Sequence, residues 1–245
     1  MSPNHDEEIC AAIEAVRDRL VDAVLANMYP NPFWDDRYGA RGRALCQEDN
    51  HHHLNYLIAA IRTHSPDSMA AYYKWLQILL VSRGMCTYHI RQNMERMEDH
   101  LRALLPAAWP AIKPYHQAGY AGLAYAQPAC QALAAHAAQI AEATTAQMYA
   151  TNPFWEQQFG PRGRALCRED NLYHLAYLQD AVGVNAPDRF GSYLDWLTGF
   201  LGRRGLAADH LHADLQILAD ELARALPVVH AQPFLTLLAA QTQPI

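Results

Sequence analysis

The chain repeats one segment of itself, and this internal repeat constrains its fold more than any other feature. Residues 31–57 match residues 152–178 at 18 of 27 positions, starting with the shared string Asn-Pro-Phe-Trp. The next 49 residues of each copy match at only 14 positions. Two copies of a unit of roughly 105 residues would account for most of the 245 residues. We therefore expect two related domains. Residues 31–57 and 152–178 have diverged least, so their shape or chemistry is the part of the unit most strongly shared by the two copies.

Composition and periodicity predict helices in both copies. Apolar residues make up 51% of the chain and charged residues 18%, with only 12 glycines, as is usual for a globular helical protein. In the first copy, apolar residues at helical spacing predict helices over 7–29, 45–62, 67–83 and 87–105. Helix boundaries are predicted at Asp67 and Asp188 as N-caps, at Gly84 and Gly205 after a helix end, and at Pro106 and Pro227.

Short connections between such helices favour antiparallel neighbours. The sequence therefore predicts an all-α protein, a tandem duplication of a four-helix up-down bundle whose two bundles are related by pseudo-twofold symmetry. The expected domains are a first bundle over 1–106, a linker over 107–127, a second bundle over 128–227 and a C-terminal tail over 228–245. Aromatic residues in the linker indicate that it packs against a bundle.

One connection is expected to be long. Residues 30–44, between the first two helices, carry Asn, Pro, aromatic, Gly and Arg residues and are predicted to form a loop of about fifteen residues. In an up-down bundle, the end that bears this loop also receives the first turn of the second helix, the end of the third and the start of the fourth. Most polar residues that the two copies share fall there, so we expect any functional site at this loop end.

A core-facing histidine strengthens this expectation. The apolar stripe of helix 45–62 includes His53, and Asp49 or Asn50 lies one turn earlier on the same side. A carboxylate four residues before a histidine can contact and orient its imidazole. Helix 67–83 is expected to bring Tyr72 and Trp75 to the same interior. The candidate ligand- or cofactor-binding residues are Trp34, Arg43, Asp49, His53, Tyr72, Trp75, Arg83 and His89, with their counterparts Trp155, Arg164, Asp170, His174, Tyr193, Trp196, Arg204 and His210.

Three interpretations of these residues stay open. Aromatic rings, a histidine and arginines can line an apolar pocket for a small molecule. An anionic ligand would suit the arginines, and helical bundles are known to hold haem and other tetrapyrroles. Two imidazoles and a carboxylate can hold a transition metal, and the sets are Asp49, His53 and His89, and Asp170, His174 and His210. Alternatively, the arginines pair with the acids while Phe33 and Trp34 close the end of the bundle, a purely structural role.

The function predicted from these features is ligand or cofactor binding, with one candidate pocket per repeat, as in a sensor. A metal-dependent helical-bundle oxidoreductase and a non-catalytic protein-interaction scaffold are the alternatives. The sequence contains no Gly-x-Ser-x-Gly, phosphate-binding loop, dinucleotide fingerprint or Cys-x-x-Cys, so nothing in it indicates nucleophilic catalysis, and the question of enzymatic activity stays open.

Charge and cysteine content limit the partners and the location. A formal charge of −6 without basic clusters argues against nucleic acid and anionic membranes as partners, and leaves small molecules or another protein. The acidic, polar N-terminus lacks the features of a secretory signal, which predicts a cytoplasmic protein. The five cysteines are expected to be buried reduced thiols, since Cys10 and Cys130, and Cys46 and Cys167, occupy equivalent positions within predicted helices.

Overall fold

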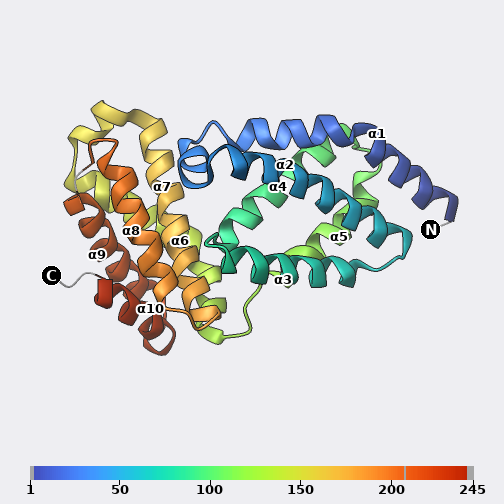
Figure 1. Ribbon diagram of the computed structural model, residues 1–245. Coiled ribbons are helices and arrows are strands. Elements are labelled where there is room, and N and C mark those ends of the chain that lie inside the picture. The colour runs from blue at the N-terminus through green and yellow to red at the C-terminus, as the bar shows by residue number, and fades with distance from the viewer. Residues whose placement is uncertain (1–2, 207, 242–245) are drawn as a thin grey trace. The chain divides into compact units, whose positions relative to one another are not determined.

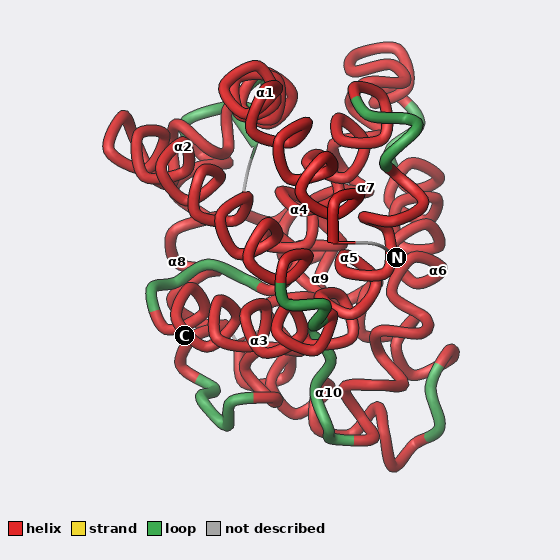
Figure 2. Tube along the Cα trace, turned by 90° about the vertical axis from the view of Figure 1, so that its right-hand side faces the viewer, coloured by secondary structure: helices red, strands yellow, loops and turns green. Residues whose placement is uncertain are grey.

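The computed structural model describes residues 3–206 and 208–241, and within them the chain forms ten α-helices and no strand (Figures 1 and 2). The predicted all-α class is confirmed. The helices are α1 (Pro3–Met28), α2 (Pro32–Arg62), α3 (Pro66–Ser82), α4 (Thr87–Leu104), α5 (Trp109–Gly122), α6 (Pro128–Thr151), α7 (Phe154–Gly183), α8 (Asp188–Gly202), α9 (Ala208–Ala225) and α10 (Val228–Gln241).

The helices are divided between two compact units. The first unit combines residues 3–83 with 89–124, and the second combines residues 84–88 with the described residues from 125 onward. In the first unit α1 packs along α2, and α3 packs on α5. In the second, α6 packs on α7 and α9, and α10 lies against α6, α7 and α9. Each unit thus contains a fifth helix that the predicted four-helix plan lacks. The predicted linker supplies α5 and the predicted tail supplies α10.

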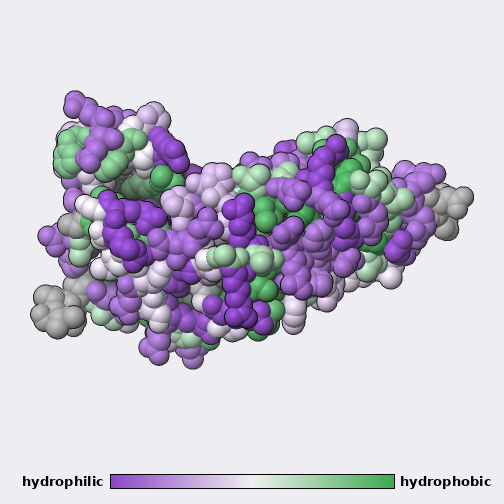
Figure 3. Space-filling model, turned by 45° about the horizontal axis from the view of Figure 1, so that its top comes forward, coloured by the Kyte–Doolittle hydropathy of each residue, from purple (hydrophilic) through white to green (hydrophobic). Residues whose placement is uncertain are grey.

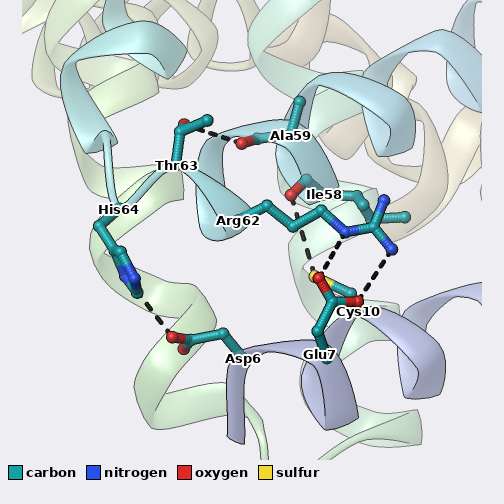
Figure 4. Close-up of polar contacts among 8 residues, drawn as sticks. All are labelled: Asp6, Glu7, Cys10, Ile58, Ala59, Arg62, Thr63 and His64. Carbon is teal, nitrogen blue, oxygen red and sulfur yellow. Dashed lines mark hydrogen bonds and ion pairs between the residues drawn. The ribbon is translucent and has the colours of Figure 1, made fainter. Parts of the chain in front are cut away.

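Polar contacts fix the start of α1 against the end of α2, as Figure 4 shows. The Arg62 guanidinium donates to both carboxylate oxygens of Glu7, at 3.0 and 3.1 Å. His64 Nδ1 lies 3.5 Å from Oδ2 of the buried Asp6, and Cys10 Sγ lies 3.9 Å from the Ile58 carbonyl oxygen. These contacts hold α1 and α2 at the end of the hairpin opposite to the predicted site.

The predicted loop over residues 30–44 is wrong, because α2 already begins at Pro32. The Phe33 N–H donates to Asn31 Oδ1 at 2.9 Å, so Asn31 is the N-cap, and Pro32 occupies the first helical position, which needs no N–H donor. The Asn-Pro pair therefore starts a helix. In the second unit, α7 begins at Phe154, where the sequence predicts the corresponding loop.

A glycine kinks each of these long helices. Gly39 in α2 has φ 64° and ψ −171°, and Gly160 in α7 has φ 56° and ψ −161°, a conformation that is essentially restricted to glycine. Beyond the kink the chain returns close to the preceding turn: a Cβ on Gly42 would lie 2.3 Å from Cβ of Tyr38. The glycines that suggested a loop instead redirect a helix.

The other helix boundaries follow the sequence closely. Gly84, at φ 87°, and Gly205, at φ 76°, lie just beyond the ends of α3 and α8, as predicted. Asp67 and Asp188 lie inside the first turns of these helices rather than at the N-caps, which are Ser65 and Pro187. All five cysteines are free, as expected; Cys10, Cys86 and Cys130 are buried, and Cys46 and Cys167 are partly buried.

None of the described helices combines the length and the apolar character that crossing a membrane requires.

Candidate functional site

In the first unit, His53 from α2 meets Tyr72 from α3. His53 Nδ1 and the Tyr72 hydroxyl lie 2.6 Å apart, and both side chains are buried. The Tyr72 ring stacks on Tyr56, with centroids 3.7 Å apart. Burial lowers the pKa of His53 to about 3, with smaller contributions from His52 and His116, so this imidazole is neutral at physiological pH. The sequence analysis expects His53 and Tyr72 in the same interior, and the structure brings these two side chains into contact.

An amide pair joins α2 to α4 beside this histidine. Asn50 Nδ2 donates to Asn93 Oδ1 and Asn93 Nδ2 donates to Asn50 Oδ1, both at 3.1 Å. Asn50 also donates to the Cys46 carbonyl oxygen at 2.8 Å. Burial raises the pKa of the Cys46 thiol to about 11, which favours the thiol over the nucleophilic thiolate at neutral pH. The pair satisfies polar groups that would otherwise be costly in the interior.

Aromatic rings surround His89, which is fully buried in the first turns of α4. The ring centroids of Phe33 and Trp34 lie 5.0 and 4.9 Å from that of His89, and the Tyr38 hydroxyl lies 3.3 Å from His89 Nδ1. Phe33 and Trp34 are only 2% and 5% exposed. Burial lowers the pKa of His89 to about 3. In the first unit these rings therefore fill the end of the helices, as the structural interpretation predicts.

The remaining candidates of the first unit lie at the surface of this cluster. Asp49 is partly buried, and burial raises its pKa, with Arg83 acting in the opposite direction. The exposed Arg43 lies over the ring of Tyr29, with its Cζ 4.8 Å from the centroid. Trp75 was expected in the interior, but this is wrong, because it is 51% exposed and stacks on the outer side of Tyr72.

The second unit builds the histidine contact again and adds a carboxylate. His174 Nδ1 lies 2.8 Å from the Tyr193 hydroxyl, and Tyr193 stacks on Tyr177 at 3.8 Å. On the other side of the ring, His174 Nε2 lies 3.3 Å from Asp214 Oδ2. A carboxylate at this position favours the proton on Nε2, which leaves Nδ1 to accept from the Tyr193 hydroxyl. Tyr193, His174 and Asp214 thus form a connected chain of polar groups.

Sequence changes between the copies make this second interior more polar. Asp214 stands where the first copy has Asn93, and Asn171 donates to Asp214 Oδ1 at 3.2 Å. On α6, Thr144 and Thr145 correspond to Val24 and Leu25 of α1, and both threonines are fully buried. The Asn171 Oδ1 atom and the Thr144 hydroxyl are buried without a hydrogen-bond partner among the described residues.

Asp170 borders the same interior. Although part of the residue is accessible to water, burial of its carboxyl group raises the pKa of Asp170 to about 7, while His174 and Arg204 act in the opposite direction. Burial likewise raises the pKa of Cys167 to about 12. Asp170 therefore lies near His174 and Arg204, two of the residues that the sequence analysis groups with it.

Aromatic and arginine side chains cover the loop end of the second unit. Trp155 contacts His210 and Tyr149, with ring centroids 5.3 and 5.6 Å apart. Arg164 lies over Tyr149 and pairs with Glu156, whose Oε2 is 3.0 Å from Nη2. Trp196 stacks on Phe200. The Arg204 guanidinium also lies over the Phe200 ring, with its Cζ 3.7 Å from the ring centroid. The predicted residues Trp155, Arg164, Trp196, Arg204 and His210 thus belong to this end of the unit.

The two sets proposed for a metal do not form ligand clusters. Across residues 3–206 and 208–241, no group of three or more His, Cys, Asp or Glu side chains is placed to hold a metal ion. His89 is packed among aromatic rings, and Asp214 rather than Asp170 is the carboxylate in contact with His174.

The sequence interpretation missed Asn93, Asp214 and Tyr38, each of which contacts a shared polar residue. Asn93 and Asp214 follow His89 and His210 by four residues, so they lie on the same helix face, and this spacing was the available signal. Tyr38 carries no such signal, because the sequence predicts a loop over its segment.

No protein-family model, curated protein or solved structure matches this chain.

Proposed function

We propose that this protein binds a small molecule or cofactor at the loop end of its helical units, as a sensor does. The observation that carries the proposal is convergence: polar side chains from three different helices meet in each unit. In the first unit these contacts are His53 with Tyr72 and Asn50 with Asn93. In the second they are His174 with Tyr193 and Asp214. Buried polar networks are costly unless fully satisfied, and they commonly mark binding sites.

The surrounding surface favours a ligand with an apolar body. Aromatic rings surround His89 in the first unit, and Trp155 contacts His210 in the second. Ligand pockets are usually apolar surfaces with a few polar groups that fix the orientation of the ligand. Arg43, Arg164 and Arg204 all stack on rings, where a guanidinium can also bind an anionic group. A small organic anion therefore suits this site better than a bare cation.

We also propose that the two units descend from one ancestral helical unit by tandem duplication. The 18 identities over residues 31–57 and 152–178 support this origin. So do the matched contacts, since both copies have the histidine–tyrosine pair and the glycine kink. A pseudo-twofold pairing of four-helix bundles, and a cytoplasmic location, stay predictions from the sequence.

The first experiment asks what the purified protein carries. We would record its absorption spectrum, measure metals by elemental analysis, and compare native with denaturing mass spectrometry. A released organic molecule supports the proposal. A visible absorption band would point to a tetrapyrrole, and one metal equivalent per unit would favour the alternative of a metal-dependent enzyme.

The decisive step is a paired substitution. His53→Ala together with His174→Ala should abolish uptake of that molecule, or the thermal stabilisation by a ligand found in a screen, while far-ultraviolet circular dichroism stays nearly unchanged. His52→Ala with His212→Ala is the matched control, because these two histidines lie exposed on α2 and α9. If the first pair only lowers the melting temperature and no ligand is found, the cluster is a packing device and an interaction scaffold becomes the better interpretation.

A further inference from the structure

One face of α7 in the second unit is covered by residues 84–88, the turn after α3 and the first two residues of α4. Three side chains that share this face are buried: Tyr173, Tyr177 and Asp180. The Tyr177 hydroxyl donates to the Gly84 carbonyl oxygen at 2.9 Å, and the Tyr88 ring contacts the Tyr173 ring, with centroids 5.6 Å apart. Asp180 accepts from the Thr87 N–H at 2.7 Å.

The corresponding face of α2 in the first unit is exposed. Its residues at the three matching positions all lie at the surface: His52, Tyr56 and Ala59. Tyr56 is 47% exposed, whereas Tyr177 is only 3% exposed. Both tyrosines stack on the matching tyrosine of the next helix, so the two faces have the same construction. Figure 3 shows apolar groups among polar ones at the surface of the first unit, whose helices α1 and α2 are blue in Figure 1.

The segment that corresponds to residues 84–88 is exposed as well. It is the turn between α8 and α9, residues 205–209, of which residue 207 lies outside the described part of the chain. Gly205, Ala208 and Asp209 are all exposed. Since Gly205 stands in place of Gly84, its carbonyl oxygen can accept from the hydroxyl of Tyr56. The chain therefore carries one exposed face and one exposed turn whose counterparts contact each other in the second unit.

The sequence differences at these positions are matched in pairs. Asp180 accepts from the N–H and the hydroxyl of Thr87. The corresponding residues are Ala59 on the exposed face and Ala208 on the exposed turn. A carboxylate buried without its donors is costly, so a change on one side alone would disfavour the contact. Two alanines instead give a small apolar contact that needs no hydrogen bond.

The second pair provides complementary charge. Tyr173 contacts Tyr88 in the second unit, and the corresponding residues are His52 and Asp209, an imidazole and a carboxylate. His52 Nε2 lies 3.7 Å from the carboxylate of Glu48, one turn earlier on α2. The other ring nitrogen of His52 is the atom with which Asp209 would pair.

We propose that the exposed α2 face of the first unit binds the α8–α9 turn of a second copy of this chain. Three pairs meet in this contact, as their counterparts do in the second unit: Tyr56 with Gly205, Ala59 with Ala208, and His52 with Asp209. The contact joins two different surfaces and is therefore heterologous, so two chains close it reciprocally or further copies extend it. It is independent of the proposed ligand site.

Sedimentation velocity of the full chain tests this contact. The parent protein should self-associate at about 100 μM. Ala59→Arg blocks the face and Ala208→Arg blocks the turn, so each variant alone should be monomeric at that concentration. Ala26→Arg and Ala223→Arg are the matched controls, because they alter exposed alanines on α1 and at the other end of α9. Both controls should associate as the parent protein does.

An equimolar mixture of the two blocked variants is the decisive sample. The Ala59→Arg chain keeps its turn and the Ala208→Arg chain keeps its face, so the mixture should form a dimer with one contact and nothing larger. A monomeric parent protein, or variants that stay monomeric when mixed, would overturn the proposal. So would an Ala208→Arg variant that still associates, because two α2 faces would then bind each other.

A conservative variant tests the hydrogen bond without adding a charge. Tyr56→Phe removes only the hydroxyl, and should weaken self-association of the chain about threefold or more. An unchanged affinity would contradict the assigned contact with Gly205. Circular dichroism checks that every variant stays folded.

Discussion

At the scale of single residues, the exchange of Asn93 for Asp214 separates the two units most clearly. The first unit uses an amide pair, in which the side-chain NH2 group of each asparagine donates to the side-chain oxygen of the other. The second unit places a carboxylate between Asn171 and His174, at 3.2 and 3.3 Å. The contact between two amides in the first unit is thus replaced by contacts to a carboxyl group in the second.

Asp170 provides a measurable test of the electrostatics of the second interior. Its pKa is raised to about 7 from a value near 3.8, chiefly by burial, so the folded state prefers the protonated acid. The stabilisation by this group is fully present below about pH 4 and is lost as pH rises through about 7. Asp170→Asn should therefore match the parent protein at pH 4 and exceed its unfolding free energy by about 1 kcal/mol or more at pH 8.

Urea unfolding at a series of pH values checks this expectation. Asp195→Asn on α8 is the control, since Asp195 is exposed and its replacement should have a small effect at every pH. A constant difference between Asp170→Asn and the parent protein from pH 4 to pH 8 would contradict the assignment.

The site could be predicted only in part, because the prediction depends on residues that recur in both copies of the repeat. His53 and Tyr72, and His174 and Tyr193, were identified because the same residues recur in both copies on apolar helix faces. Asp214 could not be found in this way, since it differs from its counterpart Asn93. The sequence analysis expects Trp75 in the interior beside Tyr72, because both lie on helix 67–83. In the structure the Trp75 ring is instead half-exposed and stacks on Tyr72.

At the scale of helices, short-range rules were sufficient for most boundaries. Pro66, Gly84 and Gly205 end or begin helices where their backbone preferences require. The same short-range rules are wrong for α2 and α7. Proline and glycine break a helix in most contexts, but here a proline starts α2, and a glycine kinks both α2 and α7 without ending them. The local sequence of a kinked helix and of a loop is nearly the same, so rules that use only neighbouring residues do not separate the two.

The kinks provide a second prediction. Gly39→Ala and Gly160→Ala should each lower the unfolding free energy by about 1–3 kcal/mol, because a Cβ is not tolerated at these dihedral angles even where space is available. A Cβ at either position would meet no atom within 4 Å, so the penalty is one of backbone conformation alone. Thermal and chemical denaturation measure it.

Gly202→Ala is the matched control, because it also has no neighbour within 4 Å but lies in α8 without a positive φ. It should be neutral or stabilising by up to about 1 kcal/mol. Equal effects at all three glycines would show that the kinks do not require glycine.

At the scale of the whole molecule, the second unit is assembled from two separate stretches of sequence. The buried Asp180 of α7 accepts from the Thr87 N–H and the Tyr125 hydroxyl, both at 2.7 Å, and from the Thr87 hydroxyl. The Tyr177 hydroxyl donates to the Gly84 carbonyl oxygen at 2.9 Å. Residues 84–88, which span the turn after α3 and the first two residues of α4, therefore complete the second unit.

Thr87→Ala tests this arrangement. It removes one hydrogen bond to a buried carboxylate and should lower the unfolding free energy by about 1–3 kcal/mol. Hydrogen exchange followed by mass spectrometry should locate the lost protection in α7 of the second unit. Thr236→Ala on α10, whose exposed hydroxyl contacts only its own helix, should have little effect. Loss of protection confined to α3 and α4 would contradict the role of Thr87.

The interleaved sequence of the second unit has a practical consequence for anyone who wishes to produce it alone. A gene fragment that begins at residue 125 encodes α6 to α10 but omits Gly84–Tyr88, so Asp180 would lose its partners on Thr87. Such a fragment should be recovered as an unstable or aggregated product unless a peptide spanning those five residues is supplied in trans or fused ahead of it.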